Sequence, residues 1–161
     1  MDERTGETAP VSSQIREHGP IKVAAWRLMM EKHQDFMRQF ELGFRERHGL
    51  TLNEFDTLIS CLPGEVVRHR DLLRSMVLSR SGLSRLLGKL EDRGLVTQAP
   101  DPEDQRGVLV GLTAAGEELR EAAARTNVEI ILAGFSGMTD ADAEEVFELV
   151  SAIRPIPPTQ G

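Results

Sequence analysis

The sequence predicts a mainly α-helical fold with one small β-hairpin. Apolar residues recur at helical spacing through most of the 161 residues, and residues typical of helix N-caps precede several of these stretches. Near the middle of the chain, two short apolar runs enclose a polar stretch, as in a hairpin. The chain is 40% hydrophobic and 28% charged, a balance typical of a globular protein. This length suits one domain, or one domain with appended helices.

The first predicted long helix runs from Ile21 to about Arg47. Pro20 suits a helix start because it has no N–H to leave unpaired, and Gly49 suits the end. The apolar arc of this helix is wider than one packing partner requires. The preceding residues 1–19 are polar and interrupted by glycine and proline, so we expect a mobile arm with at most a short helix near Ile15.

A second helix is predicted to begin near Asn53, because Thr51 and Glu54 have the spacing of a capping box. It should end at Pro63-Gly64, and its expected buried face comprises Phe55, Leu58, Ile59 and Leu62. Val66-Val67 then predict a short strand. A short helix from Arg70 to Met76 follows, with inward-facing side chains at Leu72, Leu73 and Met76.

Ser79 is the predicted N-cap of a further helix that runs to Arg93 and ends at Gly94. The hairpin strands are expected at residues 95–99 and 108–112, joined by a long polar loop over residues 100–107. Thr113 should cap a helix over residues 114–133. The last helix begins at the Thr139 and Asp142 capping pair, and the proline-rich residues 155–158 cannot continue it.

Charge is distributed unevenly along this acidic chain, whose net charge is −7. Residues 66–98 hold seven basic and three acidic side chains, whereas the remaining residues hold 12 basic and 23 acidic ones. A nucleic-acid-binding protein needs a local basic face rather than a basic total, because salt screens charges over about 10 Å. On charge alone, chance clustering in an ordinary arginine-rich helix stays an alternative.

Several classes of protein are disfavoured by what the sequence contains. It has one cysteine, Cys61, which allows neither an internal disulfide nor a cysteine-rich zinc site, and its histidines lack the spacing of a helical metal site. No apolar run approaches the roughly 20 residues that span a bilayer, and the N-terminus does not look like a secretory signal. We therefore expect a cytoplasmic protein without metal or cofactor. No glycine-rich phosphate loop or nucleophile elbow points to an enzyme.

The order helix, strand, short helix, turn, helix, hairpin is that of a winged helix-turn-helix, whose second helix enters the DNA major groove. In the helix after Ser79, four leucines fall on one side, and Ser81, Ser84, Arg85, Gly88 and Lys89 fall on or near the other. Arginine can read guanine and lysine can neutralise a phosphate. The predicted DNA-binding residues are Arg70, Ser79, Arg80, Ser81, Ser84, Arg85, Lys89 and Arg106. The alternative is an amphipathic surface helix with a solvated charged face.

Arg106 stands in the polar loop of the hairpin, where an arginine can enter the minor groove. Asp101, Glu103 and Asp104 stand in the same loop and would repel phosphates unless they are paired. We therefore expect an ion pair between Asp104 and a nearby arginine. A plain acidic turn is the alternative.

Three runs of sequence resemble the MarR family of bacterial regulators. They are residues 71–96, which include Ser79-Arg80-Ser81-Gly82-Leu83-Ser84-Arg85-Leu86; the wing residues 101–110; and Leu112-Thr113-Ala114-Ala115-Gly116. The resemblance covers about residues 50–120. It implies a winged-helix lobe at 50–113, dimerisation helices at 20–49 and 114–154 of one domain spanning 20–154, and a tail at 155–161.

The resemblance also implies a homodimeric repressor that binds a pseudo-palindromic operator and is released by a small ligand or by oxidation. Small aromatic or acidic effectors would bind between the dimer helices and the lobe, and the candidates here are Trp26, Met30, His33, Met37, Phe55 and Ile59. Dimer core is the alternative role for these six. Cys61 has no obvious basic neighbour, so we expect a buried structural cysteine. A winged-helix module that binds protein without DNA is the alternative function.

Overall fold

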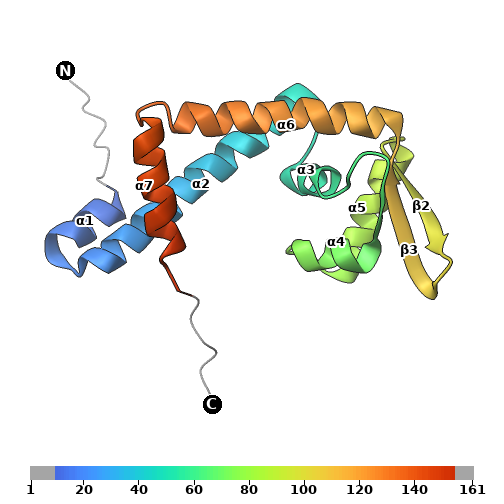
Figure 1. Cartoon of the computed structure of the whole chain (residues 1–161), viewed down its shortest axis with the longest axis horizontal. Coiled ribbons are helices and arrows are strands. Elements are labelled where there is room, and N and C mark those ends of the chain that lie inside the picture. Colours follow the sequence, from blue (N-terminus) through green and yellow to red (C-terminus); the bar gives the residue numbers. More distant parts are fainter. Residues whose placement is uncertain (1–9, 155–161) are drawn as a thin grey trace, which may run out of the picture.

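The computed structural model describes residues 10–154, except for the side chains of residues 105 and 106. Helices α1 (Val11–His18), α2 (Ile21–His48), α6 (Ala114–Gly134) and α7 (Asp140–Ser151) form one part of the chain. Helices α3 (Leu52–Ile59), α4 (His69–Ser75) and α5 (Arg80–Asp92) form the other part with strands β1 (Val66–Arg68), β2 (Val96–Asp101) and β3 (Asp104–Leu112). Figure 1 shows α2 and α6 connecting the two parts. The predicted fold class, mainly helical with a small sheet, is confirmed.

The N-terminal helix α1 packs against α2. Glu31 holds it there, because its carboxylate accepts hydrogen bonds from the backbone N–H of Ser12 at 3.0 Å and from the Ser12 hydroxyl at 2.5 Å. The short helix expected near Ile15 is therefore present, and residues 11–18 are packed helix rather than a mobile arm. Residues 1–9 and the predicted tail at 155–161 lie outside the described residues.

Most predicted helix boundaries are confirmed within one or two residues. The capping box of Thr51 and Glu54 is present, and Ser79, Thr113 and Thr139 each accept an N-cap hydrogen bond from a backbone N–H. Gly49 ends α2 in the left-handed conformation, with a φ of 61°. These signals are local, so they act wherever the chain places the helix. The second predicted helix, α3, ends at Ile59 rather than at Pro63-Gly64.

The three strands form an antiparallel sheet in the order β1-β3-β2. The predicted strand at Val66-Val67 is the edge strand β1, with Val67 opposite Val110. The long loop predicted over residues 100–107 is wrong, because β2 extends to Asp101 and β3 begins at Asp104. Gly107 allows this close pairing, since a Cβ there would lie 2.7 Å from the Cβ of Asp101.

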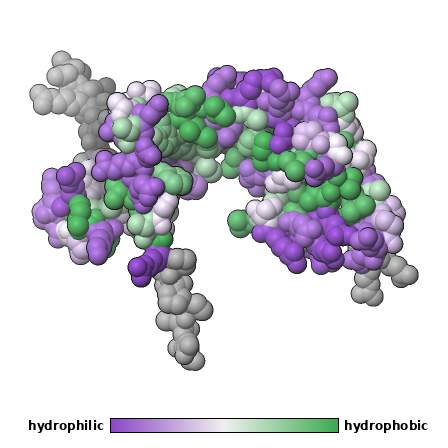
Figure 2. All heavy atoms as spheres, in the orientation of Figure 1, coloured by the Kyte–Doolittle hydropathy of each residue, from purple (hydrophilic) through white to green (hydrophobic). Residues whose placement is uncertain are grey.

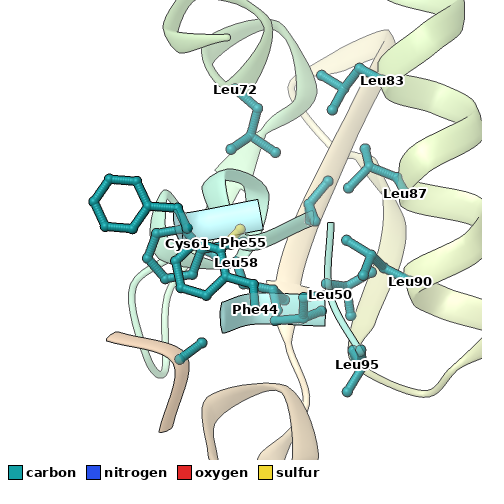
Figure 3. Close-up of a cluster of buried hydrophobic side chains, with 14 residues drawn as sticks. Phe44, Leu50, Phe55, Leu58, Cys61, Leu72, Leu83, Leu87, Leu90 and Leu95 are labelled. Carbon is teal, nitrogen blue, oxygen red and sulfur yellow. The ribbon is translucent and has the colours of Figure 1, made fainter. Parts of the chain in front are cut away.

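The hydrophobic core lies mainly in the part that carries the sheet, where α3, α4, α5 and the strands meet the C-terminal end of α2 (Figure 3). Leu83, Leu87 and Leu90 of α5 are fully buried there. Phe44 of α2 stacks on Phe55 of α3 with ring centroids 4.1 Å apart. The predicted burial of Leu62 is wrong: its side chain is 53% exposed, because α3 has already ended.

The opposite part of the molecule leaves apolar side chains uncovered. No residue of α7 is buried, and Phe147 is 67% exposed. Exposed large apolar side chains also occur at Ile21, Val23, Trp26 and Leu28 of α2 and at Val128, Ile131 and Leu132 of α6. Figure 2 shows apolar residues at the surface where α6, α7 and α2 lie close together in the view. None of the described helices is both long and apolar enough to cross a bilayer.

Candidate nucleic-acid interface

Helix α5 has one buried face and one exposed face, as its sequence predicts. Its leucines point into the core, while Ser81, Ser84, Arg85 and Lys89 are exposed. The N-cap hydroxyl of Ser79 accepts a hydrogen bond from the backbone N–H of Gly82 at 3.1 Å. The side chains that the first turn of α5 exposes, those of Arg80 and Ser81, are therefore polar, which suits insertion into a polar groove.

A groove of about 500 Å³ separates the start of α4 and the start of α5 from the wing, which is the β2–β3 hairpin. Three of the predicted residues, Arg70, Arg80 and Ser84, line it together. His69 also lines it, and its Nε2 lies 3.2 Å from the Ser84 hydroxyl. Burial, and secondarily the neighbouring Arg80, lowers the pKa of His69, so a neutral imidazole faces Ser84 near neutral pH.

A second groove of about 450 Å³ lies on the other side of α5, against the start of α3. Arg85 and Lys89 line this groove with Thr51 and Asn53. The predicted residues of α5 are thus divided between its two flanks, with Ser79 and Ser81 at its exposed N-terminal end. Hydrophilic residues cover the lower face of this lobe in Figure 2.

Ion pairs distinguish two kinds of cation on this surface. Arg70 Nη1 lies 3.5 Å from Asp104 Oδ2, which confirms the expected pairing of Asp104 with a nearby arginine. Arg80, Arg85 and Lys89 form no ion pair with another residue in the described part of the chain. These three are the cations most available to phosphates. The side chain of Arg106 lies outside the described part, and its backbone belongs to β3.

Sequence reasoning missed Arg68 and His69. Arg68 is the last residue of β1 and occupies the N-cap position of α4, where it makes no side-chain cap hydrogen bond. Its guanidinium instead pairs with Asp101, at 2.7 Å from Nε to Oδ2, and with Glu103. One signal in the sequence could have indicated Arg68. It occupies a helix N-cap position, where serine, threonine, aspartate or asparagine is usual.

The six predicted effector-binding residues are spread between surface and core. Trp26 and His33 are exposed on α2, and Met30 and Met37 are half-buried. Phe55 is buried beneath Phe44, and Ile59 packs partly buried against the same core. None of the six lines either groove described above. Within the single described chain they therefore do not meet in one of these grooves.

Cys61 is fully buried two residues after the end of α3, as expected for a structural cysteine. Burial raises the pKa of its thiol to about 11, although the nearby charge of Arg120 acts in the opposite direction. A thiol with this pKa is almost entirely protonated at neutral pH and is a poor nucleophile. Among residues 10–154, no three His, Cys, Asp or Glu side chains come together where they could hold a metal ion.

The model of the MarR family matches residues 48–107, which span the end of α2, α3 to α5, and most of the wing. Over this part of its length the chain is similar to the MarR family. Curated relatives are called transcriptional regulators: HosA of Escherichia coli O111:H- is 33% identical over 76 residues, covering 47% of this chain and 56% of its own. The organic hydroperoxide resistance regulator of Bacillus subtilis is 25% identical over 126 residues, covering 78% and 82%.

The chain spans about half the length of HosA, and a third of the length of another curated relative, BadR of Rhodopseudomonas palustris. Solved structures resemble the fold more extensively. AbsC, a MarR family regulator from Streptomyces coelicolor, superposes with a TM-score of 0.68 at 27% identity and covers 78% of this chain and 86% of its own. Sco3205 of the same organism, solved in complex with DNA, gives a TM-score of 0.69 at 22% identity, with 79% and 81% covered.

Proposed function

We propose that this chain is a sequence-specific regulator of transcription that binds double-stranded DNA through α5. The observation that carries the proposal is the exposed polar face of α5, on which Arg80, Arg85 and Lys89 have no ion-pair partner in the described part of the chain. Arg85 would read guanine in the major groove, and Lys89 would neutralise a phosphate. Arg106, carried by β3, would enter the adjacent minor groove.

The proposal includes a homodimer that binds a pseudo-palindromic operator. The exposed apolar side chains of α7, together with those of α2 and α6, support it, because contiguous apolar surface of this kind marks an interface. In this arrangement residues 20–49 and 114–154 dimerise, and residues 50–113 form the DNA-binding lobe. Two such lobes would reach half-sites about one helical turn apart.

The regulator is proposed to be a repressor that a small aromatic or acidic molecule releases from DNA. A structural neighbour, BpsR of Bordetella bronchiseptica, is described as having its DNA binding regulated by 6-hydroxynicotinic acid; it is 22% identical, with a TM-score of 0.67. Because Trp26 is the only tryptophan, its fluorescence can report on a ligand beside α2. Titration with 6-hydroxynicotinic acid and other aromatic carboxylates would test whether an effector both changes that fluorescence and releases DNA.

Selection of bound duplexes from a random pool at fixed salt is the decisive experiment. We expect a two-fold symmetric consensus sequence. Arg85→Ala and Arg106→Ala should each weaken binding to the selected duplex by about 1–3 kcal/mol. Arg125→Ala is the matched control, because this arginine is exposed on α6, outside the lobe.

The affinity for the selected duplex should also fall steeply with salt, because bound phosphates release counterions. Enrichment of no duplex, or affinities unchanged by salt and by both substitutions, would refute DNA binding. The winged-helix lobe would then be better explained as a protein-binding module.

A further inference from the structure

Asp101 organises the turn of the wing. Its carboxylate is 2% exposed: Oδ1 accepts the backbone N–H of Glu103 at 3.0 Å, and Oδ2 accepts Arg68 Nε at 2.7 Å. Gly107 of the opposite strand packs against the Cβ of Asp101. These hydrogen bonds, with that of Arg68 the largest cause, hold the pKa of Asp101 below its usual range. The carboxylate therefore stays ionised and keeps both bonds at neutral pH.

Arg68 connects this turn to the helix-turn-helix. Its backbone ends β1 and begins α4, while its side chain reaches Asp101 and Glu103 on the wing. Arg70 of α4 adds the pair with Asp104, just after the turn. The turn that precedes Arg106 is therefore tied by two cations to the helix that precedes α5. Hydrogen bonds from the backbone and side-chain N–H groups of Gln98 to Glu91 tie the base of the wing to α5.

We infer that Arg68 is a positioning residue for DNA binding: through Asp101 it sets the direction in which the wing projects, and so where Arg106 meets the minor groove. This inference rests on the proposed function. The Arg68 guanidinium is engaged by two carboxylates, so Arg68 acts through the wing and not by binding a phosphate itself. Arg68, which is 33 positions from Asp101 in the sequence, thus determines the geometry of the contact between the wing and the minor groove.

Loss of Arg68 would also leave the negative charges of Asp101 and Glu103 unpaired near the DNA. The experiment must therefore distinguish repulsion between these carboxylates and the phosphates from loss of wing positioning. Arg68→Gln removes the anchor and one positive charge. Arg68→Gln combined with Glu103→Gln removes the same anchor but restores the wild-type net charge. Glu103 is suitable for this purpose because its side chain is 76% exposed, whereas that of Asp101 is buried. Arg68→Lys keeps the charge but cannot bind two carboxylates with the same planar fork.

The experiment uses the full-length chain and the duplex that the wild-type protein selects. We expect Arg68→Gln to lower affinity about tenfold and Arg68→Lys to recover part of it. Hydroxyl-radical footprinting should show loss of minor-groove protection by the wing, while methylation by dimethyl sulfate should show that guanine N7 in the major groove remains protected. Hydrogen exchange of the amides at 104–108 should be faster in the free variant. The double variant should stay as weak as Arg68→Gln.

Full affinity of the double variant would overturn positioning in favour of charge repulsion. Wild-type minor-groove protection in Arg68→Gln would overturn the inference altogether. If Arg68→Gln fails to fold, the hydroxyl-radical footprint of Arg68→Lys tests the inference instead. Wild-type minor-groove protection together with wild-type affinity in Arg68→Lys would exclude any role for the planar fork of the guanidinium. Failure of the wild-type protein to select a duplex is a separate outcome, which refutes the proposed function and leaves no DNA contact for Arg68 to position.

Discussion

The backbone carbonyl of Leu95 faces Gly116 so closely that a Cβ on Gly116 would lie 1.9 Å from the Leu95 oxygen. The same carbonyl accepts the backbone N–H of Thr113 at 3.1 Å, and the Thr113 hydroxyl donates to Gly94 O at 2.6 Å. The start of α6 is therefore locked against the start of β2. This contact explains why the third residue of α6 is a glycine, in the run Leu112-Thr113-Ala114-Ala115-Gly116.

Gly116→Ala should lower the free energy of unfolding by about 3 kcal/mol, because the obstacle is backbone rather than a flexible side chain. Gly88→Ala in α5 is the matched control, since a Cβ there meets nothing within 4 Å. It should raise the free energy of unfolding by about 0.5–1 kcal/mol through helix propensity. Urea unfolding followed by circular dichroism measures both changes. Equal stability of the Gly116→Ala and wild-type proteins would contradict the close contact.

Glu54 is expected to stabilise the lobe more than a surface carboxylate would. It is nearly buried, accepts the Thr51 N–H at 2.8 Å to complete the α3 capping box, and pairs with Arg93 Nη1 at 3.3 Å. Glu54→Ala should cost about 2 kcal/mol of unfolding free energy, and Arg93→Ala about 1 kcal/mol.

A double-mutant cycle tests this coupling between α3 and α5. The double variant should lose less unfolding free energy than the two single losses together, because Arg93 has no Glu54 partner to lose once Glu54 is absent. Strict additivity would show that the 3.3 Å contact does not contribute in solution.

Cys61 should resist modification in the folded protein. With a pKa of about 11 and full burial, the thiol should react with iodoacetamide far more slowly at pH 7.5 than the same thiol in urea. Mass spectrometry after timed quenching measures both rates. Treatment with hydrogen peroxide should leave DNA binding unchanged, in Cys61→Ala as in the wild-type protein. Rapid native alkylation would contradict a structural role and point to a redox sensor.

The stability of the protein should fall as the pH drops below about 6.5. Burial lowers the pKa of both His48 and His69 in the folded state, so the unfolded chain takes up protons first. The full contribution to stability is therefore present above 6.5 and is lost as the pH falls through the folded-state pKa values. His48→Gln and His69→Gln should each flatten the curve of unfolding free energy against pH between 7.5 and 5. An unchanged slope in both variants would refute this.

Phe147→Asp should dissociate the proposed dimer, because it places a charge where an apolar side chain is 67% exposed in the described part of the chain. A loss of dimer affinity of at least about 30-fold is expected for a central interface side chain. Ala141→Asp adds the same charge about 120° around α7 and is the control. Sedimentation equilibrium measures the association constant. A wild-type constant for Phe147→Asp would place the interface elsewhere.

The sequence was sufficient wherever a feature depends on neighbouring residues. The capping boxes at Thr51 and Thr139, the left-handed glycine at the end of α2, and the leucine-backed polar face of α5 were all predicted correctly. Each involves residues within a few positions of one another, so helical geometry alone relates them. The ion pair of Asp104 was also anticipated in kind, because unpaired carboxylates beside a DNA surface are unfavourable.

Contacts between distant segments could not be inferred in the same way. The pairing of Arg68 with Asp101 depends on how β1 and the wing meet in the sheet. Strand pairing likewise makes the loop shorter than the one predicted from the polar residues 100–107. The exposure of Leu62 depends on where α3 stops. Helix periodicity thus determines which face of α5 is polar. Only packing of the sheet against α4 decides which arginines are engaged by wing carboxylates and which stay available for the proposed DNA contacts. The reason is that an ion pair depends on distance in space rather than along the chain.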